Sequence, residues 1–153
     1  DLDLQDTVRL EGAVNQDHIM DFYRRADIFV LASFAEGIPI VLMEAMAMEI
    51  PPVSTYVNGI PELICNREDG LLVPASSVEK LVQAIAELID NPDYRRELGR
   101  TARRGILAQY NLDQNVTDLA RVFDKYQTPC EAPETGEFCV PPNAAVPIPG
   151  RST

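Results

Sequence analysis

The chain has 153 residues, of which 46% are hydrophobic and 24% are charged, the length and composition of one soluble globular domain. Its net charge of -11 argues against a nucleic-acid-binding surface, because such a surface needs clustered Lys and Arg. No apolar run approaches the ~18 residues of a membrane span and no signal-peptide pattern opens the chain, so we expect a cytoplasmic part of a longer protein.

Short apolar runs and helical patterns alternate along the first half of the chain. The run at 27–31 is apolar throughout, as expected of a strand that helices cover on both faces. Alternation of this kind predicts an α/β fold: a Rossmann-like, parallel, right-handed, doubly wound sheet flanked by helices. In chain order we predict a strand at 8–10, a helix at 17–25, strands at 27–31 and 52–55 separated by a helix at 39–48, a short helix opening at 59–62, and a strand at 71–73.

From residue 76 onward the pattern is helical. Ser76 or Ser77 can cap a first helix, and Pro92 ends it and begins a second helix at about 92–109. A last helix is predicted at 112–126, and its apolar positions have helical spacing. These positions are Val116, Leu119, Ala120 and Phe123.

The last segment, 128–153, differs in composition from the domain predicted at 1–127. It holds six of the twelve prolines, few large apolar residues and no periodicity. Such a segment cannot offset its ordering entropy by burial, so we expect a disordered tail; a Pro-rich strap packed on the domain is the alternative. The cysteines, Cys65, Cys130 and Cys139, match no zinc pattern, and a Cys130–Cys139 bridge stays open.

Ligands of open α/β sheets bind in the loops at the carboxyl ends of the strands, here 11–16, 32–38 and 56–60. The loop at 32–38 is the most informative because a helix follows it directly. Pro39 suits the first helical position, where its missing N–H costs nothing, and the free amides of the first turn favour a phosphate. Gly37 allows a ligand to approach the backbone closely.

Glu44 is the only ionisable residue of the predicted helix at 39–48, which is apolar nearly all round and is therefore expected to be buried. A buried carboxylate needs partners, which ribose hydroxyls or an internal Arg or Lys could supply. From the residues alone, a salt-bridged structural glutamate is the favoured interpretation of Glu44. Glu36 alone is typical of an exposed loop carboxylate.

The stretch 26–63 resembles the GT-B-fold retaining glycosyltransferases of the large family that includes sucrose synthase and bacterial mannosyltransferases. The family hallmark is a Glu, seven residues and a second Glu, which Glu36 and Glu44 match, with Ser33 before them and a Glu-Gly-x-Pro context. The likeness extends over about 8–126, so the chain is identified as the C-terminal, donor-binding half of such an enzyme.

The resemblance implies a role for each matching residue. Glu36 would be the catalytic residue, in contact with the donor sugar near the reacting carbon, and Glu44 would hold the ribose hydroxyls. Gly59 and Glu62 match a signature that is chiefly architectural. Further donor-binding positions are Gly37, Ile38, Pro39, Ile40 and, more loosely, Val14.

Three residues depart from the family pattern. Glu49 and Asn58 stand where Gly is usual or common, and Asn tolerates a positive φ fairly well. Pro52 removes a ladder donor, which is tolerable at the first residue of a strand or at an edge. The fold is expected to survive these changes.

The resemblance implies transfer of a sugar from a UDP-, GDP- or ADP-sugar to an acceptor with retention of anomeric configuration, without a metal or other cofactor. The Arg and Lys that neutralise the diphosphate, and the acceptor-binding N-terminal domain, are expected upstream of this chain. We therefore expect the chain alone to be inactive. The alternatives are a non-catalytic nucleotide-binding module and a structural Rossmann-like fragment.

A group of arginines bears on whether the protein contacts a membrane. Five arginines between 95 and 104 could meet anionic lipids at the inner face of the membrane, as suits a lipid-linked acceptor or polysaccharide assembly. A solvated helix face is the favoured interpretation. His18 and Cys65 are expected to have no chemical role. The five arginines are Arg95, Arg96, Arg100, Arg103 and Arg104.

Overall fold

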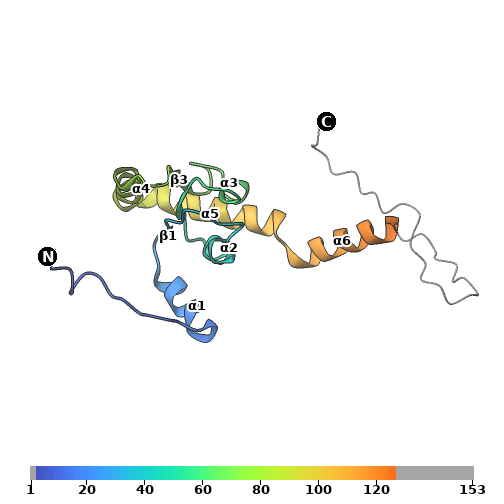
Figure 1. Ribbon diagram of the computed structural model, residues 1–153, viewed down its shortest axis with the longest axis horizontal. Coiled ribbons are helices and arrows are strands. Elements are labelled where there is room, and N and C mark those ends of the chain that lie inside the picture. Colours follow the sequence, from blue (N-terminus) through green and yellow to red (C-terminus); the bar gives the residue numbers. More distant parts are fainter. Residues whose placement is uncertain (1–2, 127–153) are drawn as a thin grey trace, which may run out of the picture. The chain divides into compact units, whose positions relative to one another are not determined.

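The computed structural model describes residues 3–126. The chain divides into two compact units, Asp1–Asn111 and Leu112–Thr153. The first unit holds a three-stranded sheet in which all pairs are parallel and the order is β1-β2-β3. Its elements (Figure 1) are α1 (Gln16–Arg25), β1 (Phe29–Leu31), α2 (Ile40–Ala47), β2 (Pro52–Thr55), α3 (Ile60–Leu63), β3 (Leu71–Val73), α4 (Val78–Asp90) and α5 (Pro92–Gln109).

Helices cover both faces of the sheet, as predicted for a doubly wound α/β fold. In β3, Leu72 packs with α2, α3 and the second half of α5, whereas Leu71 and Val73 pack with α4 and the first half of α5. This division follows from the alternation of side chains along a strand. In Figure 1 the strands lie between α2 and α4.

Helix α1 packs on α2 through a smaller third cluster. Tyr23 of α1, Ala45 of α2 and Ile50 are buried together, with Phe29 of β1 alongside. Asn15 caps α1 by accepting a hydrogen bond from the His18 amide at 3.3 Å. The predicted helix at 17–25 is confirmed. It packs on α2, the helix that contains Glu44.

The strand predicted at 8–10 is wrong: residues 8–10 are not in a strand. Val8 is 52% exposed and Leu10 is 93% exposed. A strand needs a neighbouring strand to satisfy its backbone groups, and none of the described strands pairs with this segment. The strand predicted at 27–31 begins later, at Phe29, because the Phe29 amide makes the first bond to the sheet, to the Pro51 carbonyl at 3.2 Å.

The prediction that α2 is buried all round is also wrong. Leu42, Ala45 and Met46 are buried, whereas Ile40 is 67% exposed and Glu44 is also exposed. Within the first unit the helix packs with β1, β2 and α5, and through Ala45 with α1, whereas Ile40, Val41 and Glu44 are exposed. An apolar pattern indicates that a helix avoids water, but its coverage depends on which neighbours are present.

Helix α2 begins one residue later than predicted. Pro39 has an extended ψ of 123° and is the N-cap residue rather than the first helical one. Its carbonyl accepts the amides of Leu42 at 3.1 Å and Met43 at 3.4 Å. Pro39 is buried at the point where the loop ends and the helix begins.

The C-terminus of α2 ends in a Schellman motif. The Ile50 amide donates to the Ala45 carbonyl at 3.0 Å and the Glu49 amide donates to the Met46 carbonyl at 3.0 Å. This motif places its central residue in the left-handed region, and Glu49 has φ 63°. Glycine is usual at this position because it adopts a left-handed conformation without steric cost. Glu49 has a side chain, so its backbone is strained there.

Helix α5 packs directly against this end of α2. A Cβ added to Gly99 would lie 2.0 Å from the Glu49 carbonyl oxygen, so only glycine allows the two backbones to come so close. Arg103, one turn later, donates to the Ala47 carbonyl at 2.5 Å. A cation at the C-terminus of a helix also interacts favourably with the helix dipole.

The other departures fit the structure. Pro52 is the first residue of the central strand β2, where its missing donor is tolerated, as predicted. Asn58 has φ 39°, in keeping with the usual glycine at that position. Ser77 caps α4 by accepting the Lys80 amide at 3.4 Å.

The second unit is described by α6 (Leu112–Tyr126), which has the bounds predicted. All its residues are exposed, including Val116, Leu119 and Phe123 of its apolar stripe. The predicted tail at 128–153, with Cys130 and Cys139, lies outside the described residues. Among residues 3–126, no helix combines the length and apolar character that a membrane crossing requires.

Candidate functional site

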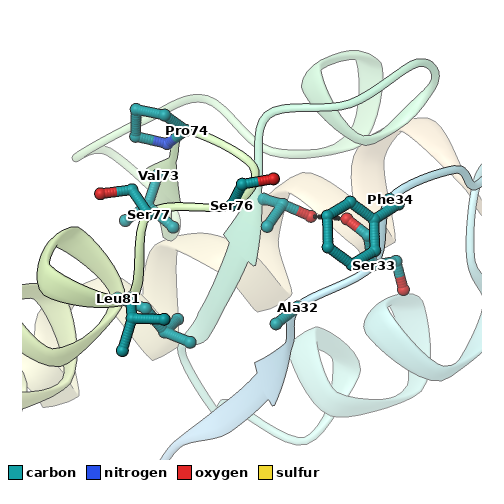
Figure 2. A pocket seen from close by; sticks show the side chains of 10 residues that line it. Ala32, Ser33, Phe34, Val73, Pro74, Ser76, Ser77 and Leu81 are labelled. Atoms are coloured by element: carbon teal, nitrogen blue, oxygen red, sulfur yellow. Dashed lines mark hydrogen bonds between the residues drawn. The ribbon is translucent and has the colours of Figure 1, made fainter.

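A pocket of about 240 Å³ lies at the carboxyl edge of the sheet, where the segments that follow β1 and β3 meet the end of β2. Residues 32–34 after β1, Thr55 at the end of β2 and residues 73–81 around the start of α4 line it. In Figure 2, Ser33 and Phe34 lie on one side of the pocket and Pro74, Ser77 and Leu81 on the other. Neither Glu36 nor Glu44 is among the lining residues.

Glu36 is half-buried beside this pocket and is tied to the sheet by side-chain hydrogen bonds. The Ser33 hydroxyl donates to Glu36 Oε1 at 2.8 Å. The carbonyl of Ser33 in turn accepts the hydroxyl of Thr55, a buried residue of β2, at 2.5 Å. The central strand thus fixes the loop that carries Glu36, and Oε2 of Glu36 stays available for another partner.

Gly59, in the loop after β2, packs closely against the loop after β1. Its amide donates to the Glu36 carbonyl at 3.4 Å. A Cβ at this position would lie 2.5 Å from the carbonyl oxygen of Gly37 and 3.3 Å from the Ile38 side chain. The close approach therefore requires glycine, and Gly59 has the architectural role that the resemblance implies.

Gly37, Ile38 and Ile40 face solvent on either side of the buried Pro39. Gly37 and Ile38 are exposed, and a Cβ added to Gly37 would meet nothing within 4 Å. No side chain caps the start of α2, and the amides of Ile40 and Val41 come before the hydrogen-bond ladder of the helix. An anion at this position would meet free N–H groups and the positive end of the helix dipole.

Glu44 lies one turn further along α2 and is bound to a neutral donor rather than a cation. The Tyr23 hydroxyl donates to Glu44 Oε2 at 2.8 Å, and the hydroxyl oxygen of Tyr23 also lies 3.4 Å from the Val41 carbonyl oxygen. None of the ion pairs found among residues 3–126 includes Glu44. The favoured interpretation of Glu44 as a buried, salt-bridged glutamate is therefore wrong.

Tyr23 is a residue of the site that the sequence pattern did not single out. Burial of the phenol raises the pKa of Tyr23 above its ordinary value of 10.0, and the hydrogen bond and negative charge of Glu44 raise it further. The phenol therefore keeps its proton and remains a donor. A signal was available, because a buried tyrosine usually needs a partner for its hydroxyl.

Val14 lies apart from the pocket at the carboxyl edge of the sheet. It is half-buried in a surface hollow of about 340 Å³, which it shares with Ala13, Asn15, His18 and Phe22. None of these residues lines the pocket of Figure 2. His18 is exposed, and its Nδ1 lies 2.7 Å from Asn15 Oδ1, a local capping contact.

The remaining candidate residues have structural or local contacts. Four of the five arginines have partners inside the first unit: Arg95 is ion-paired with Asp27 at 3.2 Å, Arg103 is bound to α2, Arg96 is ion-paired with Asp93, and Arg104 donates to the Thr101 hydroxyl at 2.9 Å. Cys65 is exposed, and a hydrogen bond from its thiol to Glu68 raises its pKa, which disfavours the reactive thiolate. In residues 3–126, no three His, Cys, Asp or Glu residues are placed to share a metal ion.

A parallel sheet covered on both faces, with loop carboxylates and a helix start at its carboxyl edge, defines a Rossmann-like α/β domain. The chain belongs to the family described as glycosyl transferases group 1, whose family model matches residues 1–105. It is 34% identical over 131 residues to the amylovoran biosynthesis glycosyltransferase AmsK of Erwinia amylovora, across 82% of this chain and 32% of the relative.

Solved structures agree with this assignment. Sucrose-phosphate synthase from Thermosynechococcus elongatus superposes with a TM-score of 0.74 and 27% identity, over 80% of this chain and 31% of that one. HepE from Anabaena, in complex with UDP and glucose, has the same fold, with a TM-score of 0.73 and 19% identity over 80% of this chain and 33% of that one. The chain thus spans about a third of the proteins it matches, and its fold is that of part of a GT-B glycosyltransferase.

Proposed function

We propose that this chain is the donor-binding part of a glycosyltransferase that takes a sugar from a nucleoside-diphosphate sugar and transfers it with retention of configuration. The observation that carries the proposal is the exposed start of α2, where free amides lie between Glu36 and Glu44 and no side chain covers Gly37. The proposal assigns the diphosphate to these amides, the sugar to Glu36 and the ribose hydroxyls to Glu44.

Charge accounts for this arrangement. When the bond between the anomeric carbon and the diphosphate oxygen breaks, its electron pair stays on the diphosphate and positive charge develops on the sugar. The amides of α2 would stabilise the first charge and the Glu36 carboxylate the second, because both groups are held before reaction. Ser33 occupies one oxygen of Glu36 and so fixes its orientation. In this proposal no metal or other cofactor takes part.

The relatives support the donor class. HepE was solved with UDP and glucose, and the Staphylococcus aureus protein TarM was solved with UDP; both resemble this chain in fold, at 19% and 22% identity. UDP-glucose is therefore a suitable first probe. The proposed acceptor belongs to a polysaccharide or lipid-linked pathway and lies at or near the inner face of the membrane.

Substitution of Gly37 tests the proposal with little risk to the fold. Gly37→Ala adds a methyl group that meets no protein atom within 4 Å, so the melting temperature should not change. If a diphosphate approaches this backbone, the methyl group should weaken UDP-glucose binding about tenfold, roughly 1.4 kcal/mol. The measurement is a calorimetric or NMR titration of both chains.

Gly105→Ala is the matched control, because it is also a Gly-to-Ala change in the same unit but lies in α5, where the nearest contact would be 3.8 Å away. It should leave binding unchanged. Equal affinity of the wild type and Gly37→Ala for UDP-glucose would contradict the proposed diphosphate position. We also expect no sugar transfer by this chain alone, since the acceptor-binding part is proposed to lie outside it; measurable turnover would contradict that part of the proposal.

A further inference from the structure

The contact between Tyr23 and Glu44 joins a rigid group to a mobile one. Tyr23 is 4% exposed, and its ring packs against that of Phe29 with centroids 5.9 Å apart. Glu44 is exposed and has several side-chain torsions that solvent leaves free. A hydrogen bond of 2.8 Å from the fixed phenol to the mobile carboxylate selects one orientation of the carboxylate.

The neutral character of this donor has a consequence for binding. A carboxylate has two oxygens, and a neighbouring arginine could occupy both with a bidentate ion pair. The phenol has one proton and occupies Oε2 only, and no ion pair among residues 3–126 involves Glu44. Oε1 and the full negative charge stay available to hydroxyl donors.

We propose that Tyr23 is a positioning residue for donor recognition, holding the Glu44 carboxylate so that its second oxygen accepts the 2′-hydroxyl of the ribose. The inference rests on the proposed function, because it requires Glu44 to contact the ribose. Tyr23 itself touches no ligand. It acts through Glu44. In this way a residue of α1 contributes to the preference of the site for ribose over deoxyribose.

The test compares UDP with 2′-deoxy-UDP as probes, because a purely structural tyrosine would affect both equally. The wild-type chain should prefer UDP about tenfold, as expected for a hydroxyl bound to a charged acceptor. Tyr23→Phe keeps the ring packing and removes only the hydroxyl. It should weaken UDP binding about fivefold and leave 2′-deoxy-UDP binding nearly unchanged, so that the preference falls to about twofold.

Three further variants make the result specific. Glu44→Gln should remove the preference, and the double variant Tyr23→Phe/Glu44→Gln should behave like Glu44→Gln alone, because the tyrosine then has no carboxylate to position. Tyr94→Phe is the matched control: its hydroxyl donates to the Arg67 carbonyl at 3.3 Å, in another part of the unit. Its preference for UDP should equal that of the wild type.

The outcomes separate the inference from the proposed function. If Glu44→Gln loses the preference and Tyr23→Phe keeps it, Tyr23 does not position the carboxylate, and the proposed role of Glu44 stands. If the wild type does not distinguish the two nucleotides, or Glu44→Gln equals the wild type, the assignment of Glu44 to the ribose fails and the inference fails with it. A loss of affinity for both probes in Tyr23→Phe, with a lowered melting temperature, would make the tyrosine merely structural.

Discussion

Glu49 shows how a single residue can be tolerated at a position that the backbone reserves for glycine. Its φ of 63° follows from the Schellman motif that ends α2, and its own carbonyl lies under Gly99 of α5. The side chain gains little in return, since its ion pair with Arg103 spans 3.9 Å and both partners are about half exposed. The local strain is therefore not compensated.

Glu49→Gly should therefore stabilise the first unit by about 0.5–1 kcal/mol, because glycine adopts the left-handed conformation without steric cost. Urea unfolding followed by circular dichroism would measure the change. Asn58→Gly serves as a comparison, since Asn58 has a smaller φ of 39° and asparagine tolerates this region better, so the gain should be smaller. A destabilised Glu49→Gly chain would show that the exposed ion pair outweighs the strain.

Tyr23 should make the free energy of unfolding depend on pH in the alkaline range. Its folded-state pKa is raised by burial and then by Glu44, so above pH 10 the unfolded chain loses this proton while the folded chain keeps it. The folded state then binds more protons, and the free energy of unfolding falls as pH rises past 10. Tyr23→Phe should lose this part of the alkaline decline. Identical declines in both chains between pH 9 and about 11 would contradict the shift.

At the scale of elements, the helices and strands with strong local signals were predicted well. The bounds of β2, β3, α5 and α6 match the prediction, because proline, glycine and apolar spacing mark their ends directly. The failures concern pairing and coverage: residues 8–10 have a strand pattern without a partner strand, and the apolar α2 is covered on one side only. Both depend on neighbours that a local pattern does not specify.

The candidate site shows the same division. Glu36, Glu44 and the glycine between them could be named as candidate site residues from the sequence. The partner of Glu44 could not, since Tyr23 lies 21 positions away, and the packing of α1 on α2 brings the two together. The Ser33–Thr55 contact likewise depends on the register of β1 against β2.

Helix α5 offers a direct test of packing between elements, because it contains two glycines in different surroundings. A methyl group at Gly99 would overlap the Glu49 carbonyl at 2.0 Å, so Gly99→Ala should destabilise the unit by about 3 kcal/mol or more. At Gly105 the nearest contact would be 3.8 Å, and Gly105→Ala should stabilise by about 0.5–1 kcal/mol through helix propensity. Chemical denaturation would compare the two, and equal effects would contradict the close docking of α5 on α2.

At the scale of the whole molecule, the chain corresponds to one part of each glycosyltransferase that it resembles. It spans about a third of the relatives it matches, and its first unit has the parallel sheet and carboxyl-edge loops of a GT-B glycosyltransferase. Several apolar side chains near the start of α2 are exposed, among them Phe34 and Ile40. In our proposal these side chains adjoin the donor site, which the acceptor-binding part would close.

The most direct measurement is a ¹H–¹⁵N NMR titration of the 153-residue chain with UDP-glucose. We expect weak, saturable binding, with the largest shifts at the amides of Gly37, Ile38, Ile40 and Val41, and about tenfold weaker binding in Glu44→Gln. Absence of any saturable shift, or shifts centred on the hollow around Val14 that persist in Glu44→Gln, would contradict the claim that Glu36, Glu44 and the start of α2 bind a nucleotide sugar.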